Sequence, residues 1–488
     1  MFLDSRPKTN KEEGMKKILV IMLALFLAIP AISYAGSVSS RWDLTIGGDI
    51  KFDFGYSDTS YGSASALWSA GNPPREPDAG NGQIYSKYGD WFWGGGETGL
   101  NFFVKGPDAW GAHTHAVIVA DFTGVWGSSA YSPASTNTGA GSPYLFPSGT
   151  NYNDFNLLIA EIGFDWENAS LKFMTGPSIF GMIPTFATNQ LSWNSVGMGT
   201  KGGPPVDPQI DVTYRFTKEV SASFGLISQQ ATVSAINSPP GFQWSNTADS
   251  YRSSLPGMQG ELAYSTDSCG KVGPYQLLIA ADGFWSQYNH IYGIGSGGVS
   301  ATDVDTAPYS NKEVNQWMGD LKFLIPLIPE KNGNKAGAFF IDAEGFTSQG
   351  MGLFQSWLAN ASSGPGGMNT GWLTDVYQRA TPGDYAAALF EGFVAHGDYY
   401  FTDAVSFNLF YLQSKAFSSK ALELTFPNGI QAGSQWIACL MYDVNPAIRL
   451  GLQWDYTDVK YAAQSSQTVG FKNIGTANDY RFAAYYFF

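Results

Sequence analysis

The residues of this sequence that could carry chemistry are charged side chains placed at every second position among apolar ones. Between residues 41 and 56 every even position is apolar or glycine, and the odd positions include several charges. Alternation with period two puts such charges on one face of a strand, where they could attract, repel or hydrogen-bond a passing solute. The charges that this spacing selects are Asp43, Asp49, Lys51, Asp53, Lys105, Glu161, Lys172, Asp211, Arg215, Asp320, Lys322, Arg449, Asp455 and Arg481.

The sequence offers few metal ligands. His113 and His115 share a strand face, but no cysteine or paired carboxylate accompanies them, so a polar wall is the better interpretation. Asp303 and Asp305 lack the regularly spaced oxygen ligands of a calcium loop and are interpreted as solvated loop residues. We therefore expect no metal and no cofactor.

Motifs of known enzymes give no support for catalysis. Two Gly-x-Gly-x-x-Gly matches occur, at residues 94–99 and 293–298, but the first precedes a strand and the second lies in a loop. A dinucleotide fingerprint needs a strand before it and a helix after it, so both are chance matches. There is no Gly-x-Ser-x-Gly elbow, phosphate-binding loop or His-Glu-x-x-His pattern, and the chain has 4 histidines. We expect a protein that is not an enzyme.

The composition favours a membrane β-barrel over a soluble protein. Charged residues are 14% of the chain, against about 25% in a soluble domain. Aromatic residues are 15% and glycines number 57, which suits the aromatic girdles and tight turns of membrane barrels. The mean hydropathy of −0.12 argues against a bundle of membrane helices. No linker divides the chain, so one large barrel with long loops is predicted.

The N-terminal region has the layout of a secretory signal. Two lysines precede an apolar run at residues 18–29, and a Ser-Tyr-Ala cleavage pattern follows. The run is too short to span a bilayer as a helix. We expect residues 1–35 to comprise an upstream extension and a signal peptide that starts at Met15 and is cleaved after Ala35. Residues 36–488 are expected to form a single barrel domain.

Net charge and cysteine content limit the partners. Residues 1–35 hold five basic and three acidic side chains, so their removal changes the formal charge from −14 to −16. A balance this acidic argues against a nucleic-acid partner and leans towards cations among the solutes. Cys269 and Cys439 are the two cysteines and fall in a turn and a strand, which argues against a disulfide framework.

The stretch from Asn478 to Phe488 is the most informative strand. Aromatic residues and an alanine occupy its even positions from Tyr480, and its odd positions begin with Asp479 and Arg481. This stretch resembles the terminal strand of Gram-negative outer-membrane barrel proteins, which typically ends in phenylalanine. The resemblance implies a location in the outer membrane and recognition by the barrel-assembly machinery through Phe488. It also implies closure against the first strand, because lipid offers no partner for an open sheet edge.

The order of strands and connections extends the resemblance to the whole mature chain. Sixteen strands, seven short turns and eight long loops can be assigned, as in bacterial outer-membrane barrels. The stretches Gly99–Gly106 and Pro208–Phe216 resemble the second strand of the general porins and the strand that leaves their constriction loop. We expect an all-β fold: a 16-stranded antiparallel transmembrane barrel with short periplasmic turns, long extracellular loops and an inward-folded third loop.

The resemblance to general porins implies a homotrimer in which the third long loop, Pro177–Pro208, narrows the lumen. Porin constriction loops commonly carry carboxylates, but here Lys201 and Asp207 are the only charges, so a less polar constriction is expected. Its expected residues are Phe180, Met182, Phe186, Asn189, Gln190, Trp193, Met198 and Lys201. The expected pore lining comprises Asp49, Lys51, Asp53, His113, His115, Glu161, Lys172, Asp211, Arg215, Lys322, Arg449 and Arg481.

These observations predict an outer-membrane porin that passes small hydrophilic solutes and ions by passive diffusion. Fixed charges in its lumen would set which solutes enter, and the third loop would set the size limit. Two alternatives stay open. A non-conducting barrel could bind a partner through the aromatic loop at residues 57–96, which is predicted to be exposed. A barrel enzyme would need several titratable groups that converge in a pocket.

Overall fold

The structure is a computed structural model, and its contacts divide the chain into two units, Met1–Arg41 and Trp42–Phe488. All described residues belong to the second unit, so the predicted signal peptide lies outside them. No helix among them is long and apolar enough to cross a membrane. The described residues are 43–58, 90–94, 98–121, 156–180, 185, 188–191, 207–227, 251–252, 255–293, 309–349, 363–364, 368–369, 376–378, 385–387, 389–417, 430–461 and 472–488.

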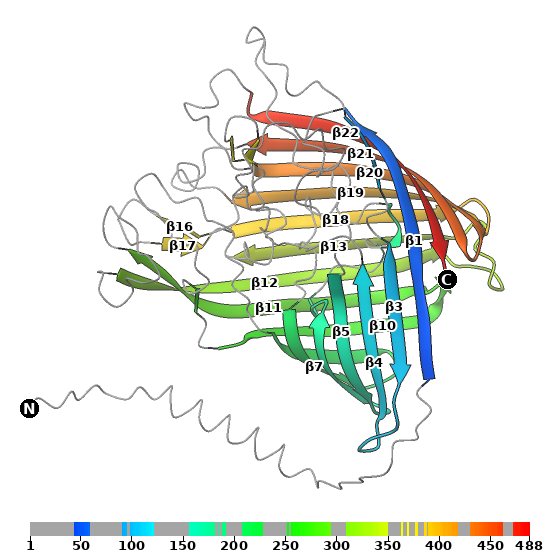
Figure 1. Ribbon diagram of the computed structural model, residues 1–488, viewed down its shortest axis with the longest axis horizontal. Coiled ribbons are helices and arrows are strands. Elements are labelled where there is room, and N and C mark those ends of the chain that lie inside the picture. Colours follow the sequence, from blue (N-terminus) through cyan, green and yellow to red (C-terminus); the bar gives the residue numbers. More distant parts are fainter. Residues whose placement is uncertain are drawn as a thin grey trace, which may run out of the picture. The chain divides into compact units, whose positions relative to one another are not determined.

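Sixteen strands form one closed antiparallel barrel (Figure 1). Each strand pairs with the next one along the ring, and the ring closes where β22 pairs with β1. The predicted strand number, order and antiparallel sense are confirmed. In ring order the strands are β1 (Asp43–Ser57), β3 (Gly99–Lys105), β4 (His113–Asp121), β5 (Asn156–Asp165), β6 (Ala169–Gly176), β7 (Asp207–Arg215), β8 (Val220–Ile227), β10 (Gly257–Val272), β11 (Tyr275–Gly293), β12 (Tyr309–Ile328), β13 (Phe339–Gln349), β18 (Leu389–Tyr400), β19 (Val405–Phe417), β20 (Ile430–Asn445), β21 (Ile448–Tyr461) and β22 (Ile474–Phe487).

The first and last strands close the ring through a continuous register, visible as blue β1 beside red β22 in Figure 1. Asp49 lies opposite Phe487, and Ser57 lies opposite Asp479. The backbone of Phe488 exchanges two hydrogen bonds of 3.1 Å with Gly48. A closed ring leaves no sheet edge exposed to lipid. The prediction that the terminal strand closes against the first is confirmed.

Strand β1 also pairs with a short strand that the sequence did not indicate. Its residues 53–57 pair with β2 (Asp90–Gly94), whereas residues 43–49 pair with β3. Trp91 of β2 stacks on Phe54 of β1 with ring centroids 5.3 Å apart, and it packs at a tilt against Tyr56 with centroids 5.0 Å apart. The prediction that residues 57–96 form only a loop is therefore wrong at β2. A strand of 5 residues is too short to give a clear alternation in the sequence.

Other predicted connections differ in a similar way. Strand β10 continues to Val272 through a register shift between Thr266 and Lys271, so Cys269 lies in a strand and not in the predicted turn. Pairings of two or three residues carry no detectable alternation, so the sequence did not predict them. They are β9 (Tyr251–Arg252) with β11, β14 (Ser363–Gly364) with β15 (Met368–Asn369), and β16 (Val376–Gln378) with β17 (Tyr385–Ala387).

The two faces of the barrel wall differ in polarity. Outward-facing apolar side chains are exposed, among them Leu321 (65%), Leu452 (56%) and Ile50 (55%). Inward-facing positions alternate with them, and on β1 they include Lys51 and Asp53, both buried. Apolar groups cover the outside, whereas the inside combines polar groups with buried apolar ones such as Phe340 and Phe410. This arrangement suits a barrel with lipid around it.

Candidate functional site

The connection between β6 and β7 brings residues 178–180 and 188–191, the internal segment, against inward-facing side chains of distant strands. Its described residues contact β10 and β11, then β18, and finally β21, β22 and β1. Strand β11 is the ninth strand of the ring and β1 is the first, so these contacts lie half a ring apart. The segment therefore lies inside the barrel and reaches both sides of its interior.

The first contacts of this segment are with β10 and β11. The N–H of Ile179 donates to Oε1 of Gln259 at 2.9 Å, and the ring of Phe180 lies 4.9 Å from that of Phe284. Gln259 also donates to Oδ1 of Asp211 at 2.9 Å. Phe180 is 2% exposed. The segment thus begins with one apolar and one polar contact to the wall.

The second contacts involve Thr188 and Asn189. Nδ2 of Asn189 donates to Oδ2 of Asp398 on β18 at 3.1 Å. The hydroxyl of Tyr275 on β11 donates to Oδ1 of Asn189 at 3.2 Å and lies 2.6 Å from Oγ1 of Thr188. Both polar atoms of the Asn189 amide are therefore bound to the wall, which fixes the direction of this part of the segment.

Asp398 belongs to a buried polar network that also includes Asp342, His396 and Asn408. Nδ1 of His396 lies 2.7 Å from Oδ2 of Asp342, and its ring stacks on Phe410 with centroids 3.9 Å apart. The amide of Asn408 has its nitrogen 3.1 Å from Nε2 of His396 and 3.3 Å from both carboxylate oxygens of Asp398. This orientation lets Asn408 donate to both neighbours, whereas its oxygen would face only acceptors. His396 then accepts at Nε2 and donates at Nδ1.

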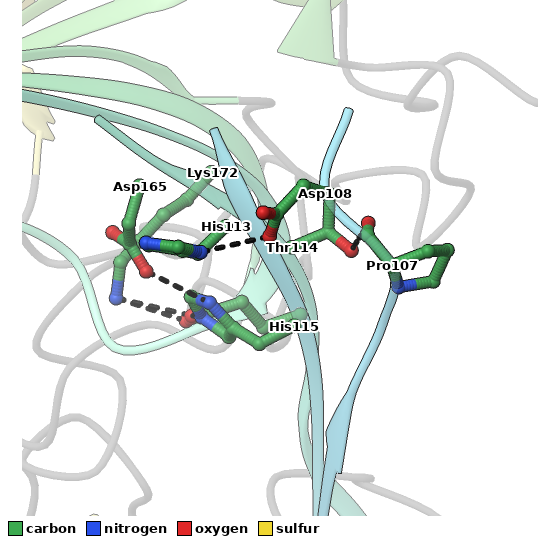
Figure 2. A network of polar contacts seen from close by, with 8 residues as sticks. Pro107, Asp108, His113, Thr114, His115, Asp165 and Lys172 are labelled. Carbon is green, nitrogen blue, oxygen red and sulfur yellow. Dashed lines mark hydrogen bonds and ion pairs between the residues drawn. The ribbon is translucent and has the colours of Figure 1, made fainter. Parts of the chain in front are cut away.

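A second polar cluster lies on the inner face of β4, β5 and β6, near their turns (Figure 2). The ring of His115 bridges two carboxylates of β5: Nε2 lies 2.8 Å from Oε1 of Glu161, and Nδ1 lies 2.9 Å from Oδ2 of Asp165. Lys172 of β6 contacts Glu161 at 3.1 Å. The ring of His115 and the ammonium group of Lys172 thus lie beside the carboxylates of Glu161 and Asp165. Gly163 provides the space for the ring, because a Cβ there would overlap it.

We expect Gly163→Ala to push the His115 ring out of its place between the two carboxylates. Overpacking of this kind destabilises proteins by about 1–3 kcal/mol. The midpoint of urea unfolding in lipid vesicles measures the change. Gly319→Ala is the matched control, because nothing lies within 4 Å of a Cβ added at Gly319. Equal midpoints for the two variants would contradict the packing of His115 over Gly163.

Inward-facing cations contact carboxylates elsewhere on the wall as well. Lys322 lies 2.6 Å from Oδ2 of Asp282 and 2.8 Å from Oε2 of Glu261. Arg449 contacts Asp443 at 2.6 Å. Oδ1 of Asp53 lies 3.6 Å from Arg481, and its Oδ2 lies 3.2 Å from Lys51. The pairs of Lys322 with Asp282, Arg449 with Asp443 and Arg481 with Asp53 join neighbouring strands across the interior face, which stabilises the wall.

The predicted pore-lining residues differ in exposure. His113 and Arg215 lie at strand ends, and His113 contacts Asp108 of the adjoining turn at 2.8 Å (Figure 2). Of the constriction residues, Phe180, Asn189 and Gln190 are buried, whereas Met182, Phe186, Trp193, Met198 and Lys201 lie outside the described residues. The buried lining residues are Lys51, Asp53, Glu161, Asp211, Lys322 and Arg481; Asp49, His115, Lys172 and Arg449 are half-buried, and His113 and Arg215 are exposed.

Sequence reasoning missed several residues that organise the interior. Glu261 and Asp282 have apolar neighbours on their strands, and this alternation is a signal from which their inward direction could have been predicted. Leu191 gave no signal, because a leucine in a loop is unremarkable in sequence. His396 faces inward whereas Glu391 faces the other side of β18, and the network of His396 depends on strands distant in sequence. The other missed residues are Gln259, Tyr275, Asp342, Asp398, Asn408 and Gln453.

The chain is similar in structure to outer-membrane channels. The outer-membrane channel DcaP of Acinetobacter baumannii matches with a TM-score of 0.57 and 12% identity, over 92% of this chain and 99% of that one. OmpT of Vibrio cholerae, in its trimer form, has a TM-score of 0.46 with 9% identity over 92% and 100% of the two chains. OprB of Pseudomonas putida has a TM-score of 0.40 and 10% identity, over 92% of this chain and 94% of that one.

In sequence, no family model and no curated protein matches the chain. The similarity to DcaP at 12% identity concerns the fold. The chain forms a closed, 16-stranded antiparallel barrel whose fold is similar to that of the outer-membrane channel DcaP.

Proposed function

We propose that the protein is a porin of the outer membrane through which small hydrophilic solutes and ions diffuse passively. The observation that carries this proposal is a closed wall with exposed apolar side chains outside and polar, charged side chains inside. Diffusion requires no turnover: interior charges act on the solutes, and the segment within the barrel limits their size. The protein is accordingly proposed to have no enzymatic activity and to need no cofactor.

The outer face of β21 supports contact with lipid. Its outward-facing residues from Ile448 to Tyr456 are all apolar or aromatic, and the next two are Asp458 and Lys460. An apolar band that ends in aromatic residues is typical of lipid-facing strands in outer-membrane barrels. Leu452 lies in the middle of this band and is 56% exposed.

We expect Leu452→Arg to destabilise the barrel by about 2–4 kcal/mol in a bilayer, because a guanidinium near mid-membrane loses its hydration. Urea unfolding in lipid vesicles measures this cost. Leu452→Ala, which removes apolar area without adding charge, is the control and should cost less. If the arginine variant were as stable as the alanine variant, the outer face of β21 would not meet lipid.

The charged side chains on β4, β5 and β6 are proposed to be the most accessible to solutes in the lumen. Ile179, Asn189 and Leu191 contact β10, β18 and β21 instead. The side chains of Lys172 and Asp165 are 39% and 42% exposed. We assign Lys172, Asp165 and His115 to the accessible lining. The buried cations of the predicted lining, such as Lys51 and Lys322, are paired with carboxylates in the wall and are proposed to act less on solutes than the accessible charges do.

Strand lengths support the proposed homotrimer. Strands β3 to β8 have 7 to 10 residues, whereas β10–β13 and β18–β22 have 11 to 20. A strand needs about 9–11 residues to span a bilayer. Strands β3 and β6, with 7 and 8 residues, have described residues at both ends, so these two are less suited to lipid and better suited to contact with another subunit. Phe488, which is 52% exposed, remains the proposed recognition point for the barrel-assembly machinery.

Flux through proteoliposomes tests the proposed function. Vesicles that contain the refolded protein should swell in solutions of small sugars, at rates that fall as the sugar becomes larger and rise linearly with its concentration. Vesicles without protein are the control. A tightly inserted protein that gives no flux above this control would refute the porin proposal and favour a barrel that binds a partner through its loops.

A further inference from the structure

We propose that Leu191 anchors the internal segment to the far wall of the barrel, and that Lys51 is the positioning residue that holds it there. This inference rests on the proposed porin function. It gives Lys51 a role different from that of a charge lining the pore: through Leu191, Lys51 sets the width of the passage.

Both backbone groups of Leu191 bind the wall. Its N–H donates to Oε1 of Gln453 on β21 at 2.5 Å. Its carbonyl oxygen accepts from Nζ of Lys51 on β1 and from the hydroxyl of Tyr485 on β22, the latter at 3.4 Å. Three consecutive strands of the ring therefore hold one residue of the segment. Release of Leu191 would leave buried polar groups without these partners, which opposes its movement.

The side chain of Leu191 fills a socket in the same wall. It is 1% exposed and packs with Cys439 and Met441 of β20 and Ala483 of β22. Gly451 of β21 provides the space, because a Cβ at that position would overlap the leucine side chain. An apolar seat combined with bound backbone groups is a specific docking site for this residue.

The ammonium group of Lys51 is enclosed by its contacts. The residue is 1% exposed, its Nζ lies 3.2 Å from Oδ2 of Asp53, and the ring of Tyr485 is centred 5.4 Å away. Solutes in the lumen would meet Lys172, which is 39% exposed, far more readily. Lys51 thus serves to hold the carbonyl of Leu191 rather than to attract solutes.

Anchoring at Leu191 fixes one end of a span whose other end is Phe180 on the opposite side of the ring. Asn189, bound to Asp398, fixes a point between them. Phe180, Asn189 and Leu191 therefore lie within the interior and occupy part of its cross-section. Loss of the anchor at Leu191 should let the segment move and widen the passage.

The two cysteines provide a direct readout of the anchor. Cys439 is buried beside Leu191, whereas Cys269 is exposed. A small hydrophilic methanethiosulfonate reagent should therefore modify Cys269 and spare Cys439 in the full wild-type chain, as read by mass spectrometry of peptides. In Lys51→Met and in Leu191→Ala, modification of Cys439 should become at least about tenfold faster, because undocking exposes the thiol.

Single-channel conductance of the same proteins tests the consequence for the passage. Lys51→Met and Leu191→Ala should both conduct more than the wild type, with little change of reversal potential in a salt gradient. Lys172→Met is the matched control: it should shift the reversal potential, change conductance little and leave Cys439 protected.

Two results would overturn the inference. One is modification of Cys439 as fast as Cys269 in the wild type. The other is a Lys51→Met protein that keeps Cys439 protected and shifts the reversal potential as Lys172→Met does, since Lys51 would then be a lining charge. Leu191→Met should keep Cys439 protected from the reagent. If Lys51→Met does not fold, the comparison of Leu191→Met with Leu191→Ala tests the anchor instead. Absence of conductance in every protein would refute the porin function alone, because labelling still reports the anchor.

Discussion

Replacing Lys322 with methionine is expected to destabilise the barrel by about 3–5 kcal/mol, because it removes the cation of a buried ion pair and leaves the carboxylate charge uncompensated. The ammonium contacts both Asp282 and Glu261, and the side chain of Asp282 is 0% exposed. Methionine has a similar length but no charge, so both carboxylates would lose the cation that they share. The midpoint of urea unfolding in lipid vesicles measures the effect.

Two variants make the Lys322 experiment specific. Lys322→Met combined with Asp282→Asn should recover part of the loss, because one of the two buried carboxylates is then removed. Lys172→Met removes a cation that is 39% exposed and should cost no more than about 1 kcal/mol. If Lys322→Met were no more destabilising than Lys172→Met, the ion pair of Lys322 would be as hydrated as a surface pair.

Replacing Ala484 with proline should prevent the barrel from closing. Ala484 lies opposite Phe52 of β1 and Leu450 of β21, at the seam where the last strand meets the first. Proline removes a backbone N–H, and the lost ladder bond costs several kcal/mol where lipid offers no replacement. We expect no folded protein after refolding into detergent or lipid, as followed by circular dichroism and protease resistance.

Ala484→Val is the control for the seam. Valine keeps the N–H and is favourable in a strand, so this variant should fold like the wild type. A proline variant that folded as well as the valine variant would show that pairing of β22 with both neighbours is not required for the barrel.

The faces of the strands could be predicted from the sequence, because two different environments impose a period of two. On β1 the alternation from Ile50 to Gly55 separates buried from exposed residues as expected. Closure against the terminal strand followed from the same physics, since an open edge is too costly in lipid. Both features depend on local pattern and on a general rule, and neither requires knowledge of distant contacts.

Partners of the interior side chains could not be predicted in this way. Lys322 contacts residues on two other strands, and His115 fits between Glu161 and Asp165 only because Gly163 lies beneath its ring. Which charged side chains pair depends on the register of the strands around the ring and on the room between side chains, and neither can be read directly from a single sequence.

The internal segment illustrates the same limit. Polar residues of the third loop were identified, and Asn189 does bind the wall through Asp398. Leu191 was not identified, because its importance comes from a socket made by strands far along the chain. Strand β2 was missed for a related reason: its stability comes from aromatic packing on β1 rather than from its own pattern.

Conductance of the refolded mature protein in a planar bilayer tests the central claim most directly. A porin should give discrete, stable current steps in symmetric salt, and a salt gradient should give a defined reversal potential. Steps that appear in threes would also support the homotrimer. Protein that inserts tightly, with the protease resistance of a folded barrel, yet never passes current would contradict the account.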